Sequence, residues 1–296
     1  MNNLSTFQID VPLVRHLVAA QFPEWADLSI KSVDPGGWDN RTFRLGDHML
    51  VRLPSAAEYA DKVAKEQYWL PQLGPHLPLP IPTPLAIGKP DENYPFPWSV
   101  YQWIDGETAS STNITDLNLF AVDLAQFLKA LQHINTTDGP IAGTHNFYRG
   151  GSLKIYDAET QEAIASLGNK IDASTVTKIW NAALASTWQH LPVWVHGDIA
   201  PNNLLVKNGK LCAVIDFGGL GIGDPACDYA IAWTFFKSES RKTFRATLSP
   251  DNATWERARG WALWKGLITY AQLPGTNVAE KENAKHVIDE IIKGET

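Results

Sequence analysis

The sequence contains one strong hairpin signal, and this signal constrains the fold more than any other feature. Residues 204–206 and 211–215 form two apolar runs, and Asn208-Gly209 lies in the short link between them. Asn-Gly favours the type I′ turn, whose twist matches that of two paired antiparallel strands. The pattern therefore predicts a tight β-hairpin across residues 204–215.

Polar motifs flank this hairpin on both sides. His-Gly-Asp-Ile-Ala-Pro-Asn-Asn occupies residues 196–203, directly before it, and Asp-Phe-Gly occupies residues 216–218, directly after it. In an antiparallel pair, the start of the first strand lies beside the end of the second. We therefore expect Asn203 to lie close to Asp216.

The flanking motifs hold the groups that phosphoryl transfer requires. A carboxylate must accept the proton of the acceptor hydroxyl, and oxygen ligands must hold the Mg²⁺ ions that neutralise the phosphates. Asp198, Asn203 and Asp216 supply such oxygens. An Asp, an Asn five residues later and then Asp-Phe-Gly is the order found in protein kinases. The alternative, an exposed loop before an ordinary hairpin, requires both motifs to flank the turn by chance.

The motifs resemble those of the aminoglycoside phosphotransferase family, which includes macrolide and choline kinases. The resemblance rests on residues 196–203, on Ile-Asp-Phe-Gly at 215–218 and on Gly-Asp-Pro-Ala-Cys-Asp at 223–228. It extends over roughly residues 10–290. It implies an O-phosphotransferase that uses ATP or GTP with Mg²⁺ and acts on a hydroxyl of a small molecule, such as an aminoglycoside or macrolide antibiotic or a related metabolite.

The resemblance also implies roles for single residues. Asp198 is expected to be the catalytic base, Asn203 and Asp216 the Mg²⁺ ligands, and His196 a buried support for the loop. A catalytically degenerate, nucleotide-binding member of the same fold is the alternative, although all three catalytic groups are present.

Two departures from protein kinases argue against a protein substrate. Gly197 occupies the position where protein kinases have an Arg that clamps a phosphorylated activation loop. Only residues 218–223 separate Asp-Phe-Gly from the next motif, Asp-Pro, and no Ala-Pro-Glu follows. The chain therefore lacks a long segment on which a peptide could dock.

Hydrophobic periodicity predicts an α+β protein with a bilobal protein-kinase-like fold. Residues 1–104 are expected to form a nucleotide-binding lobe with a small antiparallel sheet, and residues 107–296 a mostly helical lobe with the catalytic loop and acceptor site. The hinge is expected near residues 100–106. Helical patterns cover residues 11–22, 56–73, 116–133, 157–167, 173–189, 255–272 and 279–293, and the small lobe has strand patterns at 28–33, 41–45, 49–53 and 98–104.

A glycine pair lies between the first two predicted strands, where kinases carry their phosphate-covering loop. Gly36 and Gly37 let backbone N–H groups approach phosphate oxygens, and Asn40 follows them. An ordinary hairpin turn is the alternative for this pair. Its place in the small lobe favours contact with the nucleotide.

The rest of the predicted nucleotide site comes from the third strand, the following helix and the connector. Arg52 is expected to clamp the phosphates in place of the usual Lys. Glu66 is its expected ion-pair partner, with Glu58 as the second choice. Gln102 and Ile104 are expected to offer backbone groups to the nucleotide base. This expectation fits both ATP and GTP, and ATP is favoured only because it is the more common phosphate donor of kinases.

The acceptor site is the least specified part of the sequence. Aromatic residues gather after residue 228, but a Trp stripe at helical spacing more often packs in a core. Asp228 also fits a helix cap better than a ligand contact. Nearby basic residues argue against a strongly polycationic acceptor: Lys237, Arg241, Lys242, Arg245, Arg257 and Arg259. The candidate acceptor-binding residues are Asp228, Trp233, Glu239 and Trp264.

Composition excludes several other classes of protein. The 296 residues carry a formal net charge of −7, so the positive charge typical of nucleic-acid-binding proteins is missing. The longest apolar run, residues 229–236, is too short to cross a bilayer, and the first ten residues lack the pattern of a secretory leader. Cys212 and Cys227 lack metal-ligand spacing. We expect a cytoplasmic protein that is a monomer or weak dimer and binds neither nucleic acid nor membrane.

Overall fold

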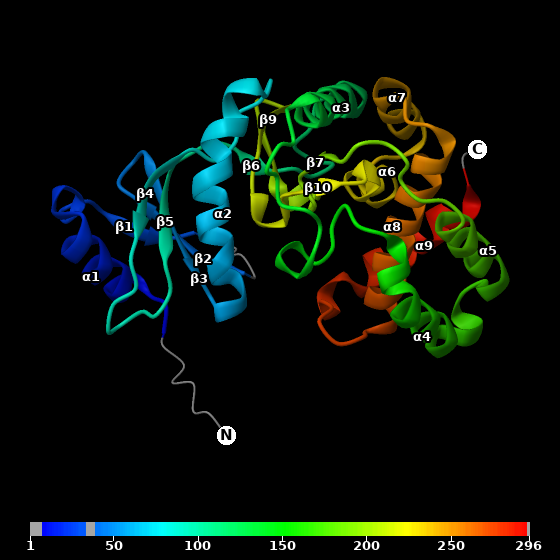
Figure 1. The fold of residues 1–296 in the computed structure, drawn as a ribbon, viewed down its shortest axis with the longest axis horizontal. Helices are drawn as coiled ribbons and strands as arrows, with labels where there is room; N and C mark the ends of the chain where they lie inside the picture. Colours follow the sequence, from blue (N-terminus) through cyan, green and yellow to red (C-terminus); the bar gives the residue numbers. More distant parts are fainter. Residues whose placement is uncertain (1–7, 34–38, 295–296) are drawn as a thin grey trace. The chain divides into compact units, whose positions relative to one another are not determined.

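The computed structural model describes residues 8–33 and 39–294 (Figure 1). The chain divides into two compact units, the first with a five-stranded sheet and the second mainly helical, so the protein is α+β as predicted. None of the described helices is long and apolar enough to span a membrane. The first unit comprises Met1–His76, Pro80–Asp105 and Ala213–Ile215, and the second comprises Leu77–Leu79, Gly106–Cys212 and Asp216–Thr296.

The first unit is built on an antiparallel sheet with strand order β1-β2-β3-β5-β4. The sequence predicted four of these strands and missed β4, which lies in the proline-rich stretch. A proline is tolerated there because Pro84 is the first residue of a strand at the edge of the sheet. The strands are β1 (Ile30–Ser32), β2 (Asn40–Leu45), β3 (Met49–Pro54), β4 (Pro84–Gly88) and β5 (Trp98–Gln102).

Helix α1 (Val11–Gln21) begins as predicted. The carboxylate of Asp10 accepts a hydrogen bond from the Leu13 backbone N–H at 3.0 Å, which caps the first turn. The buried face of α1 joins one hydrophobic core with residues of the sheet, including Trp98. This core fixes the strands that carry the nucleotide-site candidates.

Helix α2 (Ala57–Leu73) packs against β3, β4 and β5. Apolar residues such as Leu70 are buried along it, but so are Lys62 and Glu66, one helical turn apart. Charged side chains are rarely buried unless they are paired. The face of α2 that holds them therefore marks a polar site rather than core.

Helix α8 (Asn252–Ala271) organises the second unit. It packs against α4 (Asp157–Leu167), α5 (Ala173–Leu184) and α9 (Lys281–Lys293). Most of its residues are buried, as expected for a helix that is covered on several sides. On another side of the unit, α3 (Leu117–His133) packs against α7 (Ser238–Leu248).

Two helix predictions for this unit were wrong in detail. Helix α7 was not predicted, because its apolar face is reduced to a few residues such as Phe244 and Leu248 among many charges. Helix α5 ends at Leu184 rather than residue 189, since Ser186 and Thr187 are weak helix formers.

The predicted hairpin is present. Strands β8 (Leu204–Lys207) and β9 (Lys210–Val214) are joined by Asn208 and Gly209, whose φ angles of 53° and 77° are those of a type I′ turn. The short strand β6 (Glu107–Thr108) pairs with β8.

A second strand pair, which the sequence analysis missed, encloses the predicted catalytic motifs. Strand β7 (Val193–Val195) ends just before His196 and pairs with β10 (Gly221–Gly223), which begins just after the Asp-Phe-Gly motif. Each strand has three residues, too few for an alternating pattern to be recognised. The pairing brings the segment after Asp216 back beside the start of the catalytic loop.

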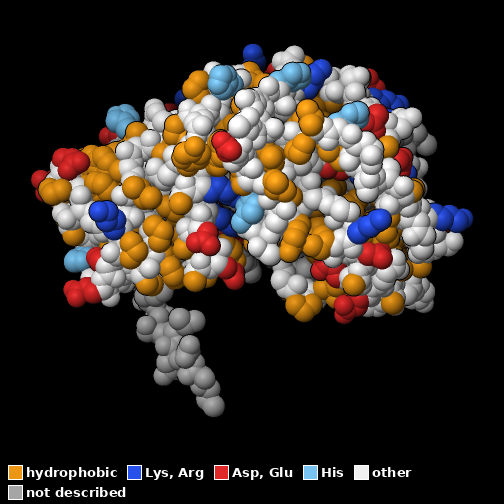
Figure 2. All heavy atoms as spheres, in the orientation of Figure 1, with side chains coloured by type: hydrophobic (Ala, Val, Ile, Leu, Met, Phe, Trp, Pro, Cys, Tyr) orange, Lys and Arg blue, Asp and Glu red, His pale blue; other side chains and the backbone are white. Residues whose placement is uncertain are grey.

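Charged side chains are spread over the surface that Figure 2 shows. Acidic and basic groups are interspersed there, with hydrophobic side chains between them. Mixed charge of this kind keeps opposite signs close together and favours solubility.

Candidate active site

The loop between β7 and β8 exposes Asp198 and holds it firmly. The Asn203 amide Nδ2 donates to both the backbone oxygen and Oδ2 of Asp198, each at 2.9 Å. Asn203 is 3% exposed, whereas Asp198 is exposed to solvent. A buried amide thus orients a carboxylate whose other oxygen, Oδ1, faces no hydrogen-bond donor among the described residues.

His196 supports this loop from inside, as the resemblance implied. It has no exposed surface, and its ring packs edge-on against Phe217 with 4.6 Å between the ring centroids. The ring atom Nδ1 lies 3.2 Å from the backbone N–H of Asp198, which donates to it. The imidazole therefore fixes the backbone of the base and is not itself open to a substrate.

Asp228 holds the same loop and is placed differently from the prediction. Its carboxylate is fully buried and accepts hydrogen bonds from the backbone N–H groups of His196 (2.8 Å) and Gly197 (2.7 Å). Burial raises the pKa of Asp228, and the two N–H donors oppose that shift. An inaccessible carboxylate cannot contact an acceptor, so Asp228 is a structural anchor. The capping position belongs to Asp224, which accepts from the Ala226 N–H.

The residue between His196 and Asp198 has to be glycine. Gly197 adopts a φ of 83°, and a Cβ added there would lie 2.2 Å from the backbone oxygen of Gly219. The catalytic loop and the segment after Asp-Phe-Gly therefore pack backbone against backbone. A side chain at position 197 would separate them.

Asp216 adopts the left-handed conformation, with φ 64° and ψ 73°. Such a backbone costs energy in a residue other than glycine and is found disproportionately at functional sites. Its carboxylate accepts a weak hydrogen bond from the Gly218 N–H at 3.4 Å. Asp216 and the amide oxygen of Asn203 are hard oxygen donors of the kind that suits Mg²⁺. Among the described residues no group of three or more His, Cys, Asp or Glu side chains is placed to hold a metal ion.

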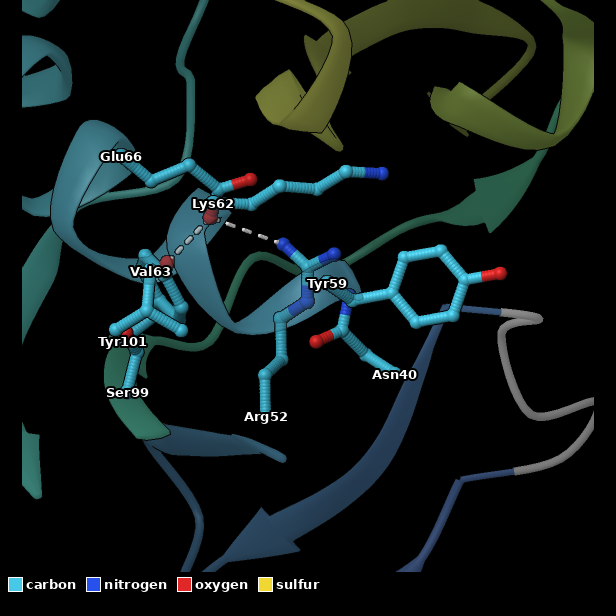
Figure 3. A pocket seen from close by; sticks show the side chains of 8 residues that line it. All are labelled: Asn40, Arg52, Tyr59, Lys62, Val63, Glu66, Ser99 and Tyr101. Carbon is cyan, nitrogen blue, oxygen red and sulfur yellow. Dashed lines mark hydrogen bonds and ion pairs between the residues drawn. The ribbon is translucent and has the colours of Figure 1, made fainter. Parts of the chain in front are cut away.

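The predicted ion pair of the first unit is present (Figure 3). Arg52 on β3 places Nη1 3.3 Å from Oε2 of Glu66 on α2, and both side chains are largely buried. The hydroxyl of Tyr101 on β5 donates to the same carboxylate oxygen. The other candidate partner, Glu58, is exposed on the first turn of α2. Glu66 is therefore held from two sides.

The same pocket contains a second cation that the sequence analysis missed. The Lys62 ammonium lies 2.5 Å from the Asp39 carboxylate and 4.9 Å from the centre of the Tyr59 ring. Asn40 also lines this pocket. The spacing of Lys62 and Glu66 on one helix face was the signal available in the sequence. Gly36 and Gly37 lie outside the described residues.

Comparison with known proteins identifies the family. The model of the Phosphotransferase enzyme family (APH) matches residues 32–261, more than three quarters of the chain. The chain belongs to this family. The match includes all the catalytic-loop residues described above and the Arg52–Glu66 pair.

Individual relatives in this family are distant in sequence. An aminoglycoside 3'-phosphotransferase of Escherichia coli is 27% identical over 186 residues, which cover 59% of this chain and 64% of that protein. The alignment thus spans less than two thirds of that curated relative.

Solved phosphotransferase structures share the fold. The GDP and kanamycin complex of APH(2")-IIia has a TM-score of 0.75 at 18% identity and covers 96% of this chain and 99% of its own. The macrolide 2'-phosphotransferase MphH from Brachybacterium faecium has a TM-score of 0.63 at 20% identity, covering 95% and 98%. The prediction of the fold of this family is therefore confirmed.

One of the two predicted connector residues already has its backbone donor occupied. The Gln102 backbone N–H donates to the oxygen of Thr83 at 2.9 Å, and Trp103 donates to His48 at 2.8 Å. The N–H of Ile104 makes no such bond to another described residue. Of the two candidates, Ile104 is thus the one whose backbone donor is available to a nucleotide base.

The four predicted acceptor-binding residues are not brought together. Trp233 is 3% exposed and packs against Trp255, with 4.7 Å between the ring centroids, so it belongs to the core. Glu239 is exposed in the first turn of α7. Trp264 is 5% exposed, donates from Nε1 to Glu159 at 2.5 Å, and packs against Tyr156 and Trp261.

Several basic residues that argued against a polycationic acceptor have structural roles instead. Arg257 forms a two-point ion pair with Asp224, in which burial raises the pKa of Asp224 and the guanidinium opposes the rise. Arg241 is buried and bonds to Glu290 and to backbone oxygens. The charges of Arg257 and Arg241 are paired with carboxylates inside the unit, so these two residues do not exclude a cationic acceptor.

Proposed function

We propose that this chain is a nucleotide- and Mg²⁺-dependent O-phosphotransferase that phosphorylates a hydroxyl group of a small molecule. The observation that carries the proposal is Asp198, an exposed carboxylate held by the buried Asn203 in a loop whose backbone is anchored by Asp228. Membership of the Phosphotransferase enzyme family supports it.

In the proposed reaction Asp198 accepts the proton of the acceptor hydroxyl. Because Asn203 binds Oδ2, the free Oδ1 is the atom that takes the proton. The acceptor oxygen then bonds to the terminal phosphorus of the nucleotide, and the nucleoside diphosphate leaves. Asn203 and Asp216 would hold Mg²⁺, which when bound neutralises charge on the phosphates.

Arg52 is proposed to bind the phosphates of the nucleotide. A guanidinium offers two parallel N–H donors to a phosphate, and its orientation here is set by Glu66. Tyr101 in turn fixes Glu66 through its hydroxyl. The donor is proposed to be ATP or GTP: among the related structures, APH(2")-IIia was solved with GDP and APH(2")-IIa with ATP and streptomycin.

The acceptor is proposed to be an antibiotic of the aminoglycoside or macrolide class or a related metabolite. The E. coli relative is an aminoglycoside 3'-phosphotransferase, and MphH is a macrolide 2'-phosphotransferase. We further propose that the enzyme works in the cytoplasm, where nucleoside triphosphates are available, as a monomer or weak dimer.

The test is acceptor-dependent release of nucleoside diphosphate. Purified full-length protein is incubated with Mg²⁺ and ATP or GTP against a panel of macrolides, aminoglycosides, choline, homoserine and sugars. We expect release above the acceptor-free background with one class, and its loss when Mg²⁺ is chelated. Nucleotide binding without release across the panel would favour the degenerate alternative. Absence of nucleotide binding in a thermal-shift assay would overturn the proposal.

A further inference from the structure

A short segment of the second unit lies directly against the catalytic loop. The buried amide of Asn146 donates to the backbone oxygens of Arg149 (2.9 Å) and Gly219 (3.2 Å). A Cβ added to Gly197 would lie 3.0 Å from Cβ of Arg149. The backbone of Arg149 is therefore packed beside the residue that precedes Asp198.

The Arg149 side chain is the centre of an aromatic cluster. Its guanidinium carbon lies 5.2 Å from the ring centre of Trp261 and 4.9 Å from that of Trp264. The Tyr156 ring packs on the same two indoles, at 5.3 and 4.1 Å between centroids. Two indole faces hold the guanidinium in place by cation–π attraction, without a carboxylate.

A second cation, Lys265, belongs to the same cluster. It follows Trp264 on α8 and stands one turn after Trp261, and its side chain is partly open to solvent and partly covered by its neighbours. The positive charge of Arg149 lowers the pKa of the Lys265 ammonium, and the negative charge of Asp198 raises it. We call Arg149, Tyr156, Trp261, Trp264 and Lys265 the Arg149 cluster.

The donors of this cluster lack acceptors. Neither the Arg149 guanidinium nor the Lys265 ammonium makes an ion pair or hydrogen bond with another described residue, and the buried Nε1–H of Trp261 has no acceptor either. The acidic groups that attract Lys265 besides Asp198 are Glu159 and Glu280. Both bind other donors, since Glu159 accepts from Trp264 and Glu280 from Asn277.

This arrangement is unfavourable for the protein on its own. Burial, followed by the charge of Arg149, lowers the pKa of Lys265, which means that the charged ammonium is disfavoured where it stands. Neither cation forms a direct ion pair with a carboxylate of the described residues, so a ligand can supply the negative charge that these two groups lack. Strain points the same way, because Phe147 and Tyr148, just before Arg149, both adopt left-handed φ angles of 53° and 56°.

We infer that the Arg149 cluster binds an oxyanion of the acceptor, so that the substrate is a small alcohol bearing a carboxylate or phosphate group. This inference rests on the proposed function and narrows its substrate class. Arg149 and Lys265 bind the anion, the aromatic faces contact the carbon skeleton, and the hydroxyl is presented to Asp198 nearby. Strongly polycationic aminoglycosides are repelled by the same two cations.

The test compares matched ligands with one carbon skeleton. Full-length protein with Mg²⁺ and a non-hydrolysable ATP analogue is titrated with glycerol, D-glycerate, glycerol 3-phosphate and kanamycin, and calorimetry measures the affinity of each ligand. We expect D-glycerate or glycerol 3-phosphate to bind about tenfold or more tightly than glycerol. The stronger of the two anions identifies the carboxylate or the phosphate as the recognised group. Equal or tighter binding of glycerol or kanamycin would overturn the inference.

Variants then locate the binding site. Lys265→Gln is the deciding change because Lys265 is partly open to solvent and no ring packs on its ammonium, whereas Arg149→Gln also removes packing from two indoles. We expect K265Q to weaken anion binding about tenfold, to leave affinity for the ATP analogue unchanged and not to lower the melting temperature. Lys154→Gln, another exposed lysine of the same unit, is the matched control and should change nothing. Unaltered anion affinity in K265Q would refute the assignment.

The two proposals fail in different ways. If the proposed function is wrong, nucleotide binding and diphosphate release are absent, and titration without nucleotide still decides whether K265Q alters oxyanion binding. If only the inference is wrong, nucleotide binding and acceptor-dependent release persist, but neutral or cationic acceptors are preferred.

Discussion

The catalytic loop and the Arg149 cluster are packed against each other, yet they differ in whether their polar groups have hydrogen-bond partners within the protein. In the loop, the buried groups are matched: Asp228 accepts two backbone N–H groups, and Asn203 binds Asp198 twice. In the cluster, two cations and one indole N–H have no acceptor among the described residues.

This difference indicates that the loop positions the catalytic base, whereas the cluster binds a ligand. Matched groups are held by the protein itself, so they fix the base before any ligand arrives. Unmatched donors are held only by packing, and their missing partners must come from outside. Changes in the loop should therefore cost stability as well as activity, and loss of the Lys265 charge in the cluster should cost binding without costing stability.

Asp198 is the exception inside the loop and should give the largest effect. Asp198→Asn keeps the shape of the side chain but removes the proton acceptor, so we expect a loss of roughly 10²- to 10⁴-fold in kcat. Because Asp198 is exposed, the melting temperature should stay within about a degree of the parent. Rates of diphosphate release and thermal unfolding measure both. Unchanged turnover would exclude Asp198 as the base.

Asp228→Ala should give the largest loss of stability among the changes in the loop. Two buried N–H groups lose their acceptor, which predicts a loss of about 2–5 kcal/mol in the free energy of unfolding, together with lower kcat. Asp228→Asn retains one acceptor oxygen and should lose less. Urea denaturation of both variants checks the order. Equal stability of D228A and the parent would show that these bonds do not hold the loop.

Gly197→Ala tests the close contact between the two backbones. The φ of 83° and the approach of the Gly219 oxygen together predict a loss of about 1–3 kcal/mol and a lower kcat. Gly275→Ala is the matched control, because Gly275 has a φ of 82° but no atom within 4 Å of an added Cβ. A similar loss of stability in the two variants would assign the effect to φ alone.

Lys265→Gln should give the smallest effect on stability, and with the opposite sign. Since the folded state lowers the pKa of Lys265, the unfavourable charge is fully present at neutral pH and fades as pH rises through the folded pKa toward the unfolded value. K265Q should thus be slightly more stable than the parent at neutral pH, with the difference shrinking at alkaline pH. Denaturation at both pH values measures this, and a less stable variant at neutral pH would indicate a structural role.

Local chemistry explains which features could be predicted. The Asn208-Gly209 turn and the cap at Asp10 follow from turn preference and capping, and the pairing of Arg52 with Glu66 was expected from the resemblance to the family. Strand β4 could not be recognised because proline disfavours strands unless it stands at an edge, and only the assembled sheet defines its edge.

Predictions of the acceptor region were weaker for a similar reason. Trp233 and Trp264 both lie in parts of the sequence that are rich in aromatic residues. Only the packing shows that Trp233 belongs to the core and that Trp264 contacts Arg149, next to the catalytic loop. Asp228 follows a turn motif typical of a cap, but its bonds reach back to His196 and Gly197.

The sequence by itself determined the hairpin, the flanking catalytic groups and the family, because these depend on residues near one another in the chain and on specific spacing. Only the tertiary structure decided that Asp228 anchors the catalytic loop and that Arg149 meets Lys265 across more than a hundred residues. The physical reason is that these two kinds of feature depend on interactions over different distances along the chain. Turn and capping preferences act over a few residues, whereas the burial of a carboxylate or the meeting of two cations depends on which distant segments pack together.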